Sequence, residues 1–273
     1  MSGGTVKLSA EKLNVWIGRK KILNDISFEC RLGLVGLLGR NGSGKTTLIK
    51  AMLNLGCRHE GEVSVEMQKE GGEAVRVRLS DLSGRERARY MAYVPQELHS
   101  WAHCTVLDFV VTGRSPYLGW LQNPGKRDYN EAGEVLEALG ISFLEQRYMD
   151  QISGGERKMA YLARARVQKA AWMLLDEPAA GLDFGRQHQF FEDLTKCLRE
   201  SRTGAIVSIH DPVLAYTYCD QFLILRDGRM EAMLSREDED FEDMYLLQLE
   251  RLYGRRAVFA DTSEGRTMIW RRT

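Results

Sequence analysis

The sequence predicts an α/β protein in which a helical segment interrupts a parallel sheet. Three runs of apolar residues, 34–38, 172–175 and 205–209, support the sheet. Runs of this length and composition are typical of parallel strands that are buried on both faces. Residues 97–169 support the helical segment, because apolar side chains recur there at helical spacing, most clearly in 129–139.

The N-terminal part predicts antiparallel strands instead. Apolar residues alternate with other residues in 13–17 and in 26–30, and two further strand patterns, 63–66 and 75–79, flank the glycine pair at 71–72. Alternation is typical of strands with one face toward solvent, and glycines between two such strands favour a hairpin. We therefore expect an antiparallel β-subdomain ahead of the helical segment.

Residues 39–47 form a glycine-rich loop between the first apolar run and a helical pattern. Gly39, Gly44, Lys45 and Thr46 satisfy the pattern G-x-x-x-x-G-K-[ST]. The complete stretch is Gly39, Arg40, Asn41, Gly42, Ser43, Gly44, Lys45, Thr46 and Thr47. In this context the loop binds phosphate, so we expect Lys45 to reach the β- and γ-phosphates of a nucleotide and Thr46 to ligate Mg²⁺. A glycine-rich turn that binds nothing is the much less favoured alternative.

Two adjacent carboxylates end the apolar run 172–175. Asp176 and Glu177 follow it directly, and Pro178 prevents the strand from continuing. Nucleotides bind at the carboxyl edge of parallel sheets. We expect Asp176 to hold Mg²⁺ and Glu177 to polarise an attacking water. By itself such a pair is more often a solvated turn, but the phosphate-binding loop upstream reverses that preference.

His210 and Gln96 follow two other predicted strands. His210 comes after 205–209 and so falls at the same predicted sheet edge as the carboxylates, where we expect it to contact a γ-phosphate. The alternative is a histidine that only makes structural hydrogen bonds. Gln96 follows the strand 91–94 after Pro95, and taken alone it carries no functional information.

Residues 153–156 open a predicted helix. Ser153 and Glu156 have the spacing of a capping box, which is a common structural device. Gly154 and Gly155 permit close approach, so the same helix end can present N–H groups and a hydroxyl to an anion. Both interpretations hold if the anion arrives with a second protein copy.

The C-terminal part predicts smaller elements. Residues 222–225 form another strand pattern, and Asp227-Gly228 favours a tight hairpin turn. Acidic residues in 237–243 predict the start of a helix, and the turn residues around 263–265 predict a final hairpin.

Composition excludes several classes of protein. Among 273 residues, Lys+Arg 38 balance Asp+Glu 38, so no basic nucleic-acid footprint is expected. Five cysteines lack metal-type spacing, which favours reduced thiols in a cytosolic protein. No apolar run approaches the roughly 20 residues that a membrane-spanning helix needs. We expect a chain that is soluble by itself and docks on a membrane protein if it works at a membrane.

In their order, these motifs resemble those of the ATP-binding-cassette ATPases. The matching stretches are 39–46, 93–96, 152–156, 174–178, 181–183 and His210. The resemblance covers about 8–229, and the signature 152–156 is specific to this class. It implies an α/β fold with a P-loop NTPase (RecA-like) core in 1–96 and 170–273, which includes the β-subdomain and a C-terminal extension. It implies a helical subdomain in 97–169.

The resemblance also implies roles for residues outside the phosphate-binding loop. Gln96 would contact Mg²⁺ and the attacking water, His210 would be the switch histidine, and Asp183 would cross a dimer interface. The signature residues, which would bind the γ-phosphate of an ATP held by a second copy, are Ser153, Gly154, Gly155 and Glu156. Ile17 stands where the family has the aromatic residue that stacks on adenine, and Trp16 beside it is the other candidate.

A stretch in the helical segment narrows the class. Residues 106–110 followed by 112–117 are similar to importers of iron–siderophore complexes, haem and cobalamin. This resemblance implies an ATPase that works as two copies beneath two integral membrane permease subunits, at the cytoplasmic face of the membrane and fed by an extracytoplasmic binding protein. A plain helix end with a Gly-Pro turn is the alternative. We expect the permease to dock near Gln96, against residues that include His99 and Trp101.

Other classes stay open. ATPases of the same fold act in DNA repair or on ribosomes, but the interval from Lys45 to Ser153 lacks sustained heptads and the chain holds one cassette. A small-molecule kinase has no use for 153–156, and motifs alone do not exclude export. His99 and His103 share a predicted helix face, but without a third ligand a surface role is favoured over a metal site.

Overall fold

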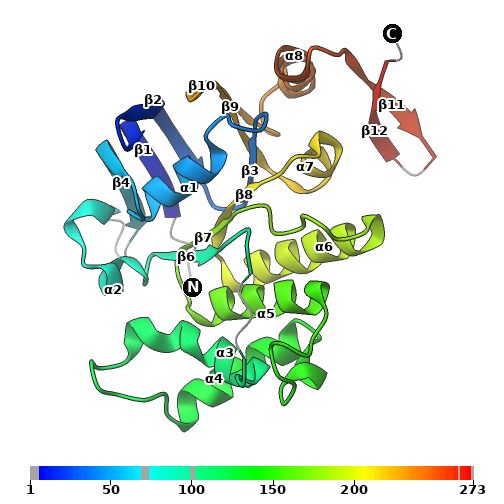
Figure 1. Cartoon of the computed structure of the whole chain (residues 1–273). Helices are drawn as coiled ribbons and strands as arrows, with labels where there is room; N and C mark the ends of the chain where they lie inside the picture. Colours follow the sequence, from blue (N-terminus) through cyan, green and yellow to red (C-terminus); the bar gives the residue numbers. More distant parts are fainter. Residues whose placement is uncertain (1–5, 69–73, 99–101, 264, 272–273) are drawn as a thin grey trace. The chain divides into compact units, whose positions relative to one another are not determined.

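The computed structural model describes residues 6–68, 74–98, 102–263 and 265–271. Two compact units divide the chain: Met1–Ser80 with Ile206–Thr273, and Asp81–Ala205. Each unit contains both strands and helices, as an α/β fold requires (Figure 1).

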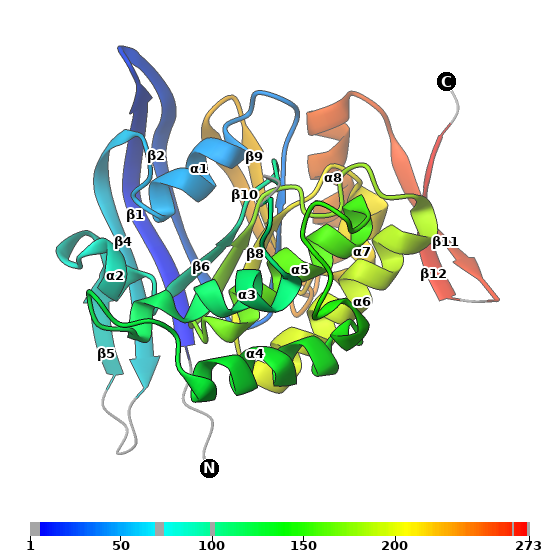
Figure 2. The same cartoon turned by 60° about the horizontal axis from the view of Figure 1, so that its bottom comes forward.

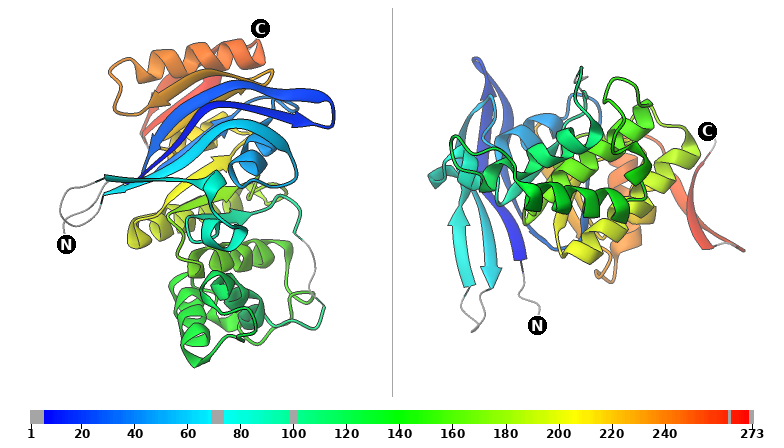
Figure 3. Two further views of the ribbon diagram at one scale, coloured as in Figure 1. Left: turned by 90° about the vertical axis from the view of Figure 1, so that its left-hand side faces the viewer. Right: turned by 90° about the horizontal axis from the view of Figure 1, so that it is seen from below.

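The first unit begins with an antiparallel sheet. Its strands are β1 (Val6–Ile17), β2 (Lys20–Arg31), β4 (Arg58–Gln68) and β5 (Ala74–Arg78), in the order β2-β1-β4-β5. Figure 3 shows β1 and β2, in blue, curving together along their length. Alternation buries Leu13 and Val15, and helix α1 (Lys45–Met52) packs against these strands. The hairpin predicted from the alternation is confirmed, because Val65 pairs with Val77; its two glycines lie outside the described residues.

The same unit holds a second sheet, in which β3 leads to the phosphate-binding loop. Its strands run in the order β10-β9-β3-β8. They are β3 (Leu34–Leu38), β8 (Gly204–Ser208, which contains the unit boundary), β9 (Gln221–Arg226) and β10 (Arg229–Ser235). β3 is parallel to β9 and every residue of β3 is buried, as its apolar composition predicts. Asp227 and Gly228 both adopt positive φ, at 48° and 73°, so the predicted hairpin turn is confirmed.

Beyond α7 (Pro212–Tyr218), the C-terminal part of the first unit adds one helix and two strands. They are α8 (Phe241–Tyr253), β11 (Ala257–Thr262) and β12 (Gly265–Trp270). The predicted final hairpin is confirmed. Helix α8 begins at Phe241, inside the acidic stretch 237–243 and not at its first residue. The Asp238 carboxylate accepts a hydrogen bond from the Ser235 N–H at 2.7 Å, which holds a turn ahead of the helix.

The second unit combines two parallel strands with helices. β6 (Met91–Val94) pairs with β7 (Trp172–Leu175), and α6 (Phe184–Ser201) follows β7. The other elements are η1 (Leu79–Asp81, at the boundary), α2 (Gly84–Arg87), α3 (Val106–Val111), η2 (Thr112–Tyr117), α4 (Lys126–Ala138), η3 (Ser142–Leu144) and α5 (Gly154–Val167). Figure 2 shows α3, α4 and α5 packed side by side.

Membrane-spanning helices were not expected from the sequence. Within the described parts of the chain, none of the helices combines the length and the apolar character that crossing a bilayer requires.

Candidate functional site

In the first unit, the phosphate-binding loop connects β3 to α1. Gly44 is the N-cap of α1 and has φ 104°, a conformation that favours glycine. A Cβ at Gly44 would also lie 2.5 Å from Cδ2 of Leu23. Backbone conformation and packing therefore both require a glycine where the loop turns into the helix.

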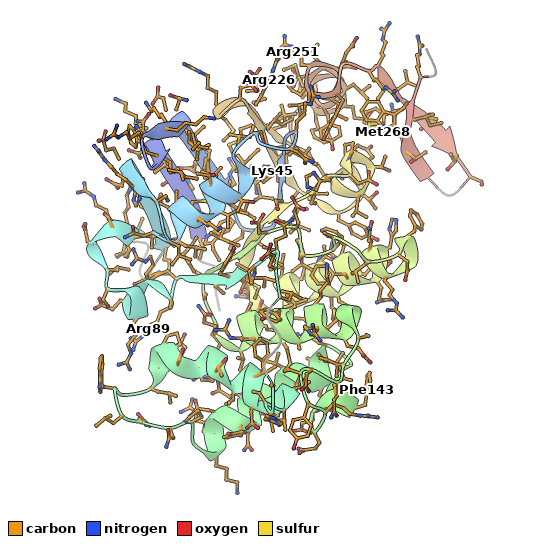
Figure 4. All side chains as sticks on the ribbon, viewed as in Figure 1. Lys45, Arg89, Phe143, Arg226, Arg251 and Met268 are labelled. Atoms are coloured by element: carbon orange, nitrogen blue, oxygen red, sulfur yellow. The ribbon has the colours of Figure 1, made fainter. Side chains whose placement is uncertain are left out.

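Lys45 folds back over this loop. Its ammonium donates hydrogen bonds to the carbonyl oxygens of Gly39 at 2.8 Å and Arg40 at 3.4 Å, and Figure 4 labels Lys45 at the start of α1. The Ser43 hydroxyl is buried and has no hydrogen-bond partner among the described residues. The first N–H groups of a helix also lack intrahelical partners. This set of a cation, a hydroxyl and backbone donors fits a polyphosphate.

His210 lies near this loop. The N–H of Ile209 donates to the carbonyl of Leu37 at 3.2 Å, which joins the end of β8 to β3 just before the loop begins. His210 is the next residue and is exposed. The structure therefore places His210 at the sheet edge that carries the loop. Its predicted position beside the two carboxylates, which belong to the second unit, stays a prediction.

The two adenine candidates at the end of β1 differ in their surroundings. Ile17 is 56% exposed. The ring of Trp16 has the Lys21 ammonium and the Arg58 guanidinium each 5.2 Å from its centroid. Ile17 therefore offers open apolar surface, whereas the Trp16 ring is already engaged by two cations.

In the second unit, parallel pairing of β6 and β7 brings Gln96 to the carboxylates. Val94 pairs with Leu175, and the N–H of Asp176 donates to the carbonyl of Val94 at 2.9 Å. Two residues beyond this strand pair, the side-chain amide of Gln96 donates to Oε2 of Glu177 at 2.9 Å. Glu177 has φ 46°, an uncommon conformation for a residue other than glycine and one that is often retained at functional sites.

Asp176 differs from its neighbour in being buried. Asp176 is 1% exposed. Burial of the Tyr93 hydroxyl raises the pKa of Tyr93 to about 12, and the Asp176 carboxylate adds to that shift. A carboxylate and a threonine hydroxyl are oxygen donors of the kind that Mg²⁺ prefers, so Asp176 and Thr46 suit that ion chemically. Among the described residues, no group of three or more His, Cys, Asp or Glu side chains could hold a metal ion by itself.

The predicted capping box at the start of α5 is confirmed. Glu156 N–H donates to the Ser153 hydroxyl at 3.3 Å, and Ser153 N–H donates to the Glu156 carboxylate at 2.8 Å. Hydrogen bonds from the Ser153 side chain and then its backbone lower the pKa of Glu156. A Cβ at Gly154 would meet nothing within 4 Å, so this helix end is open to an approaching group.

Asp183 begins the helix after the carboxylates. Its side chain caps α6 by accepting a hydrogen bond from the N–H of Arg186 at 3.0 Å. The sequence did not single out Lys158 of α5, whose ammonium donates to the carbonyl of Ala180 in the intervening turn. Burial lowers the pKa of Lys158, and the Glu177 carboxylate opposes that shift. Lys158 thus links the signature helix to the turn between Glu177 and Asp183, and no local motif marks it.

Tyr253 of α8 is a second residue that motifs did not identify. Its hydroxyl is buried without a hydrogen-bond partner among the described residues. Burial and then the Asp211 carboxylate raise its pKa, while Arg40 of the phosphate-binding loop opposes the shift. The charge of Arg40 thus acts on the Tyr253 hydroxyl at the end of α8, within the first unit.

The proposed permease contact near Gln96 is only partly described. Gln96 itself is exposed, but His99 and Trp101 lie outside the described residues.

Comparisons with known proteins agree with these motifs. The model of the ABC transporter family matches residues 23–180. A probable iron chelatin transport ATP-binding protein of Helicobacter pylori is 31% identical, over 82% of this chain and 85% of that protein. The hemin import ATP-binding protein HmuV of Rhodococcus jostii is 32% identical, over 92% of this chain and 81% of that protein. Among solved structures, a metal-chelate type ABC transporter in an inward-facing conformation aligns with a TM-score of 0.78 at 23% identity, over 97% of this chain and 96% of that one.

Proposed function

This chain belongs to the ABC transporter family of ATP-binding proteins, and on that premise we propose that it hydrolyses ATP to power an importer. The cargo we propose is an iron–siderophore, haem or cobalamin-type complex. The observation that carries the ATPase proposal is the hydrogen bond from Gln96 to Glu177 in a chain that also holds a complete phosphate-binding loop. The relatives named for iron chelatin and hemin transport support the choice of cargo.

Each unit contributes distinct roles. In the first unit, the loop and Lys45 bind the phosphates, His210 contacts the γ-phosphate, and Ile17 rather than Trp16 takes the adenine. In the second unit, Glu177 is the general base and Gln96 orients its carboxylate. We assign Mg²⁺ ligation to Thr46, Gln96 and Asp176; when bound, this ion neutralises phosphate charge.

The signature needs a second copy of the chain. We propose that Ser153, Gly154 and Gly155 approach the γ-phosphate held by the opposite copy, while the capping box keeps Glu156 in place. Asp183 lies at the dimer interface in this arrangement. Two ATP molecules bound head to tail would close the dimer, and hydrolysis would release it. Residues 97–169 form the proposed signature-bearing subdomain.

Location and partners follow from the importer proposal. The dimer works at the cytoplasmic face of the membrane, bound to two permease subunits that receive cargo from an extracytoplasmic binding protein. In this arrangement the cargo contacts lie on the other subunits, so this chain supplies energy and not selectivity.

Transport of labelled cargo tests the proposal. A tagged chain should co-purify with an integral membrane protein from its own cells. Deleting the chain should abolish uptake of one of three labelled compounds (a ferric siderophore, haem or cobalamin), and the wild-type chain should restore it. Normal uptake of all three would reject the cargo, and the absence of any membrane partner would favour an ATPase that acts outside transport.

Gly154→Ala is expected to impair ATP turnover without unfolding the chain. The added methyl group meets nothing within 4 Å, so the free energy of unfolding should change by less than about 1 kcal/mol. It would block the approach of the opposite γ-phosphate, so ATPase activity of the assembled transporter should fall by about tenfold or more. Gly84→Ala is the matched control, because its methyl group also meets nothing within 4 Å but lies outside the signature. If both variants hydrolysed ATP equally fast, the signature would have no part in the mechanism.

A further inference from the structure

The segment between η2 and α4 presents two large apolar side chains to solvent. Trp120 is 94% exposed and Leu121 is 92% exposed. The N–H of Gln122 donates to the carbonyl of Gly119 at 3.1 Å, and the N–H of Gly119 donates to Oε1 of Gln122 at 2.9 Å. These two bonds close a turn with Trp120 and Leu121 at its centre, so an ordered backbone holds both side chains outward.

This pair differs from the other exposed apolar residues. Among the described residues, the next most exposed large apolar side chains are Phe184 at 77% and Phe143 at 69%. Single apolar residues on a surface are ordinary, but adjacent ones at the tip of a turn indicate an interaction site. None of the proposed roles in ATP binding or hydrolysis uses Trp120 or Leu121.

Basic side chains lie beside both ends of this turn. Arg85 and Arg89 each donate through Nε to the carbonyl of Pro116, at 3.2 Å and 3.1 Å. Figure 4 labels Arg89 beside α2. On the other side Lys126 and Arg127 are exposed, and the Arg127 side chain is 87% accessible.

Two carboxylates lie in the first turns of α2 and α4, beside these cations along the chain, and both are hydrogen-bonded within the protein. Asp128 accepts hydrogen bonds from the N–H of Gly125 at 3.0 Å and from Nε of Arg114 at 3.1 Å. Glu86 accepts a hydrogen bond from the N–H of Ser83 at 3.0 Å in the cap of α2. Asp128 is half-buried, so four exposed cations (Arg85, Arg89, Lys126 and Arg127) outnumber one exposed carboxylate, that of Glu86, around the apolar turn.

We propose that this turn inserts into the surface of an anionic lipid membrane. Trp120 and Leu121 enter the boundary between headgroups and acyl chains, where an indole ring with its polar N–H is favoured. The four basic side chains beside the turn contact the lipid phosphates, to which cations near a membrane surface are attracted. An apolar tip surrounded by cations complements the charge of an anionic bilayer. The contact is additional to docking on a permease and does not depend on ATP hydrolysis.

Vesicle co-sedimentation of the full chain tests the proposal. The chain should bind vesicles of phosphatidylcholine mixed with phosphatidylglycerol more tightly than vesicles of phosphatidylcholine alone, and added salt should weaken that binding. The double variant Trp120→Ser/Leu121→Ser should lose roughly tenfold or more in partition coefficient. Lys126→Gln/Arg127→Gln should bind less well and show a weaker dependence on salt.

Phe143→Ser is the matched control, because it removes an exposed apolar side chain of the same unit away from the turn. It should bind vesicles like the wild type, and thermal unfolding should show that all variants are folded. Failure of the wild-type chain to bind anionic vesicles would overturn the proposal, as would equal binding by the Trp120→Ser/Leu121→Ser variant. Binding only to vesicles that contain the permease, lost in that variant, would assign the turn to a protein contact and also overturn it.

Discussion

Glu177→Gln should lower ATP turnover by roughly 10²- to 10⁴-fold, the usual contribution of a general base. Glutamine has nearly the same shape but cannot take the proton of the attacking water. Its side-chain oxygen can still accept the hydrogen bond from Gln96, which measures 2.9 Å in the wild-type chain. The variant should therefore bind Mg-ATP and stay in the closed dimer. Phosphate release measures the first effect, and light scattering with saturating Mg-ATP measures the second.

The control for this variant is another Glu→Gln change. Glu134 is exposed on α4, so Glu134→Gln should hydrolyse ATP at the wild-type rate. Retained hydrolysis in Glu177→Gln would mean that another residue is the base. If the variant binds Mg-ATP but remains monomeric both in solution and with the permease, the proposed nucleotide-clamped dimer is wrong.

Arg114→Met should lower the free energy of unfolding at neutral pH by about 3–5 kcal/mol, as expected when one partner of a buried ion pair is removed. Arg114 is 7% exposed and makes ion pairs of 3.1 Å with Asp128 and with Glu131, whose side chains are 14% and 12% exposed. It also donates to the carbonyl of Val167 at the end of the signature helix, at 3.2 Å. Methionine fills similar volume but leaves Asp128 and Glu131, which are half-buried, without this cation. Denaturant unfolding measures the loss.

The effect of Arg114→Met should depend on pH. The pKa of Asp128 is lowered first by the Gly125 N–H and then by Arg114, and the pKa of Glu131 is lowered first by Lys169 and then by other cations that include Arg114. Because both folded pKa values lie below the unfolded ones, these groups stabilise the fold above about pH 4 and lose that contribution as pH falls through the folded pKa. The difference between wild type and variant should therefore narrow in acid.

Arg127→Met provides the comparison for Arg114→Met. Arg127 pairs with Glu131 at 3.3 Å, but its side chain is 87% exposed. Solvent screens such a pair, so its loss should cost less than about 1 kcal/mol at any pH. Equal destabilisation by the two variants would show that burial of Arg114 does not determine its contribution.

Sequence patterns predicted the parts of the molecule that neighbouring residues encode. The phosphate-binding loop needs glycines at set positions between a strand and a helix, and Gly44 with φ 104° is one of them. The capping box of Ser153 and Glu156 and the turn at Asp227-Gly228 are likewise short-range. Such features depend on backbone conformation and hydrogen bonds within a few residues, so spacing alone identifies them.

Tertiary structure decided the contacts between residues that are distant in the chain. Gln96 is uninformative in sequence, and it reaches Glu177 only because β6 and β7 pair in the register that sets Val94 beside Leu175. Motifs also did not mark Lys158, nor the exposure of Trp120. By itself the sequence determined which chemical groups stand at strand and helix ends. Strand register and side-chain packing decided which of them meet, because both depend on the whole fold and no local spacing encodes them.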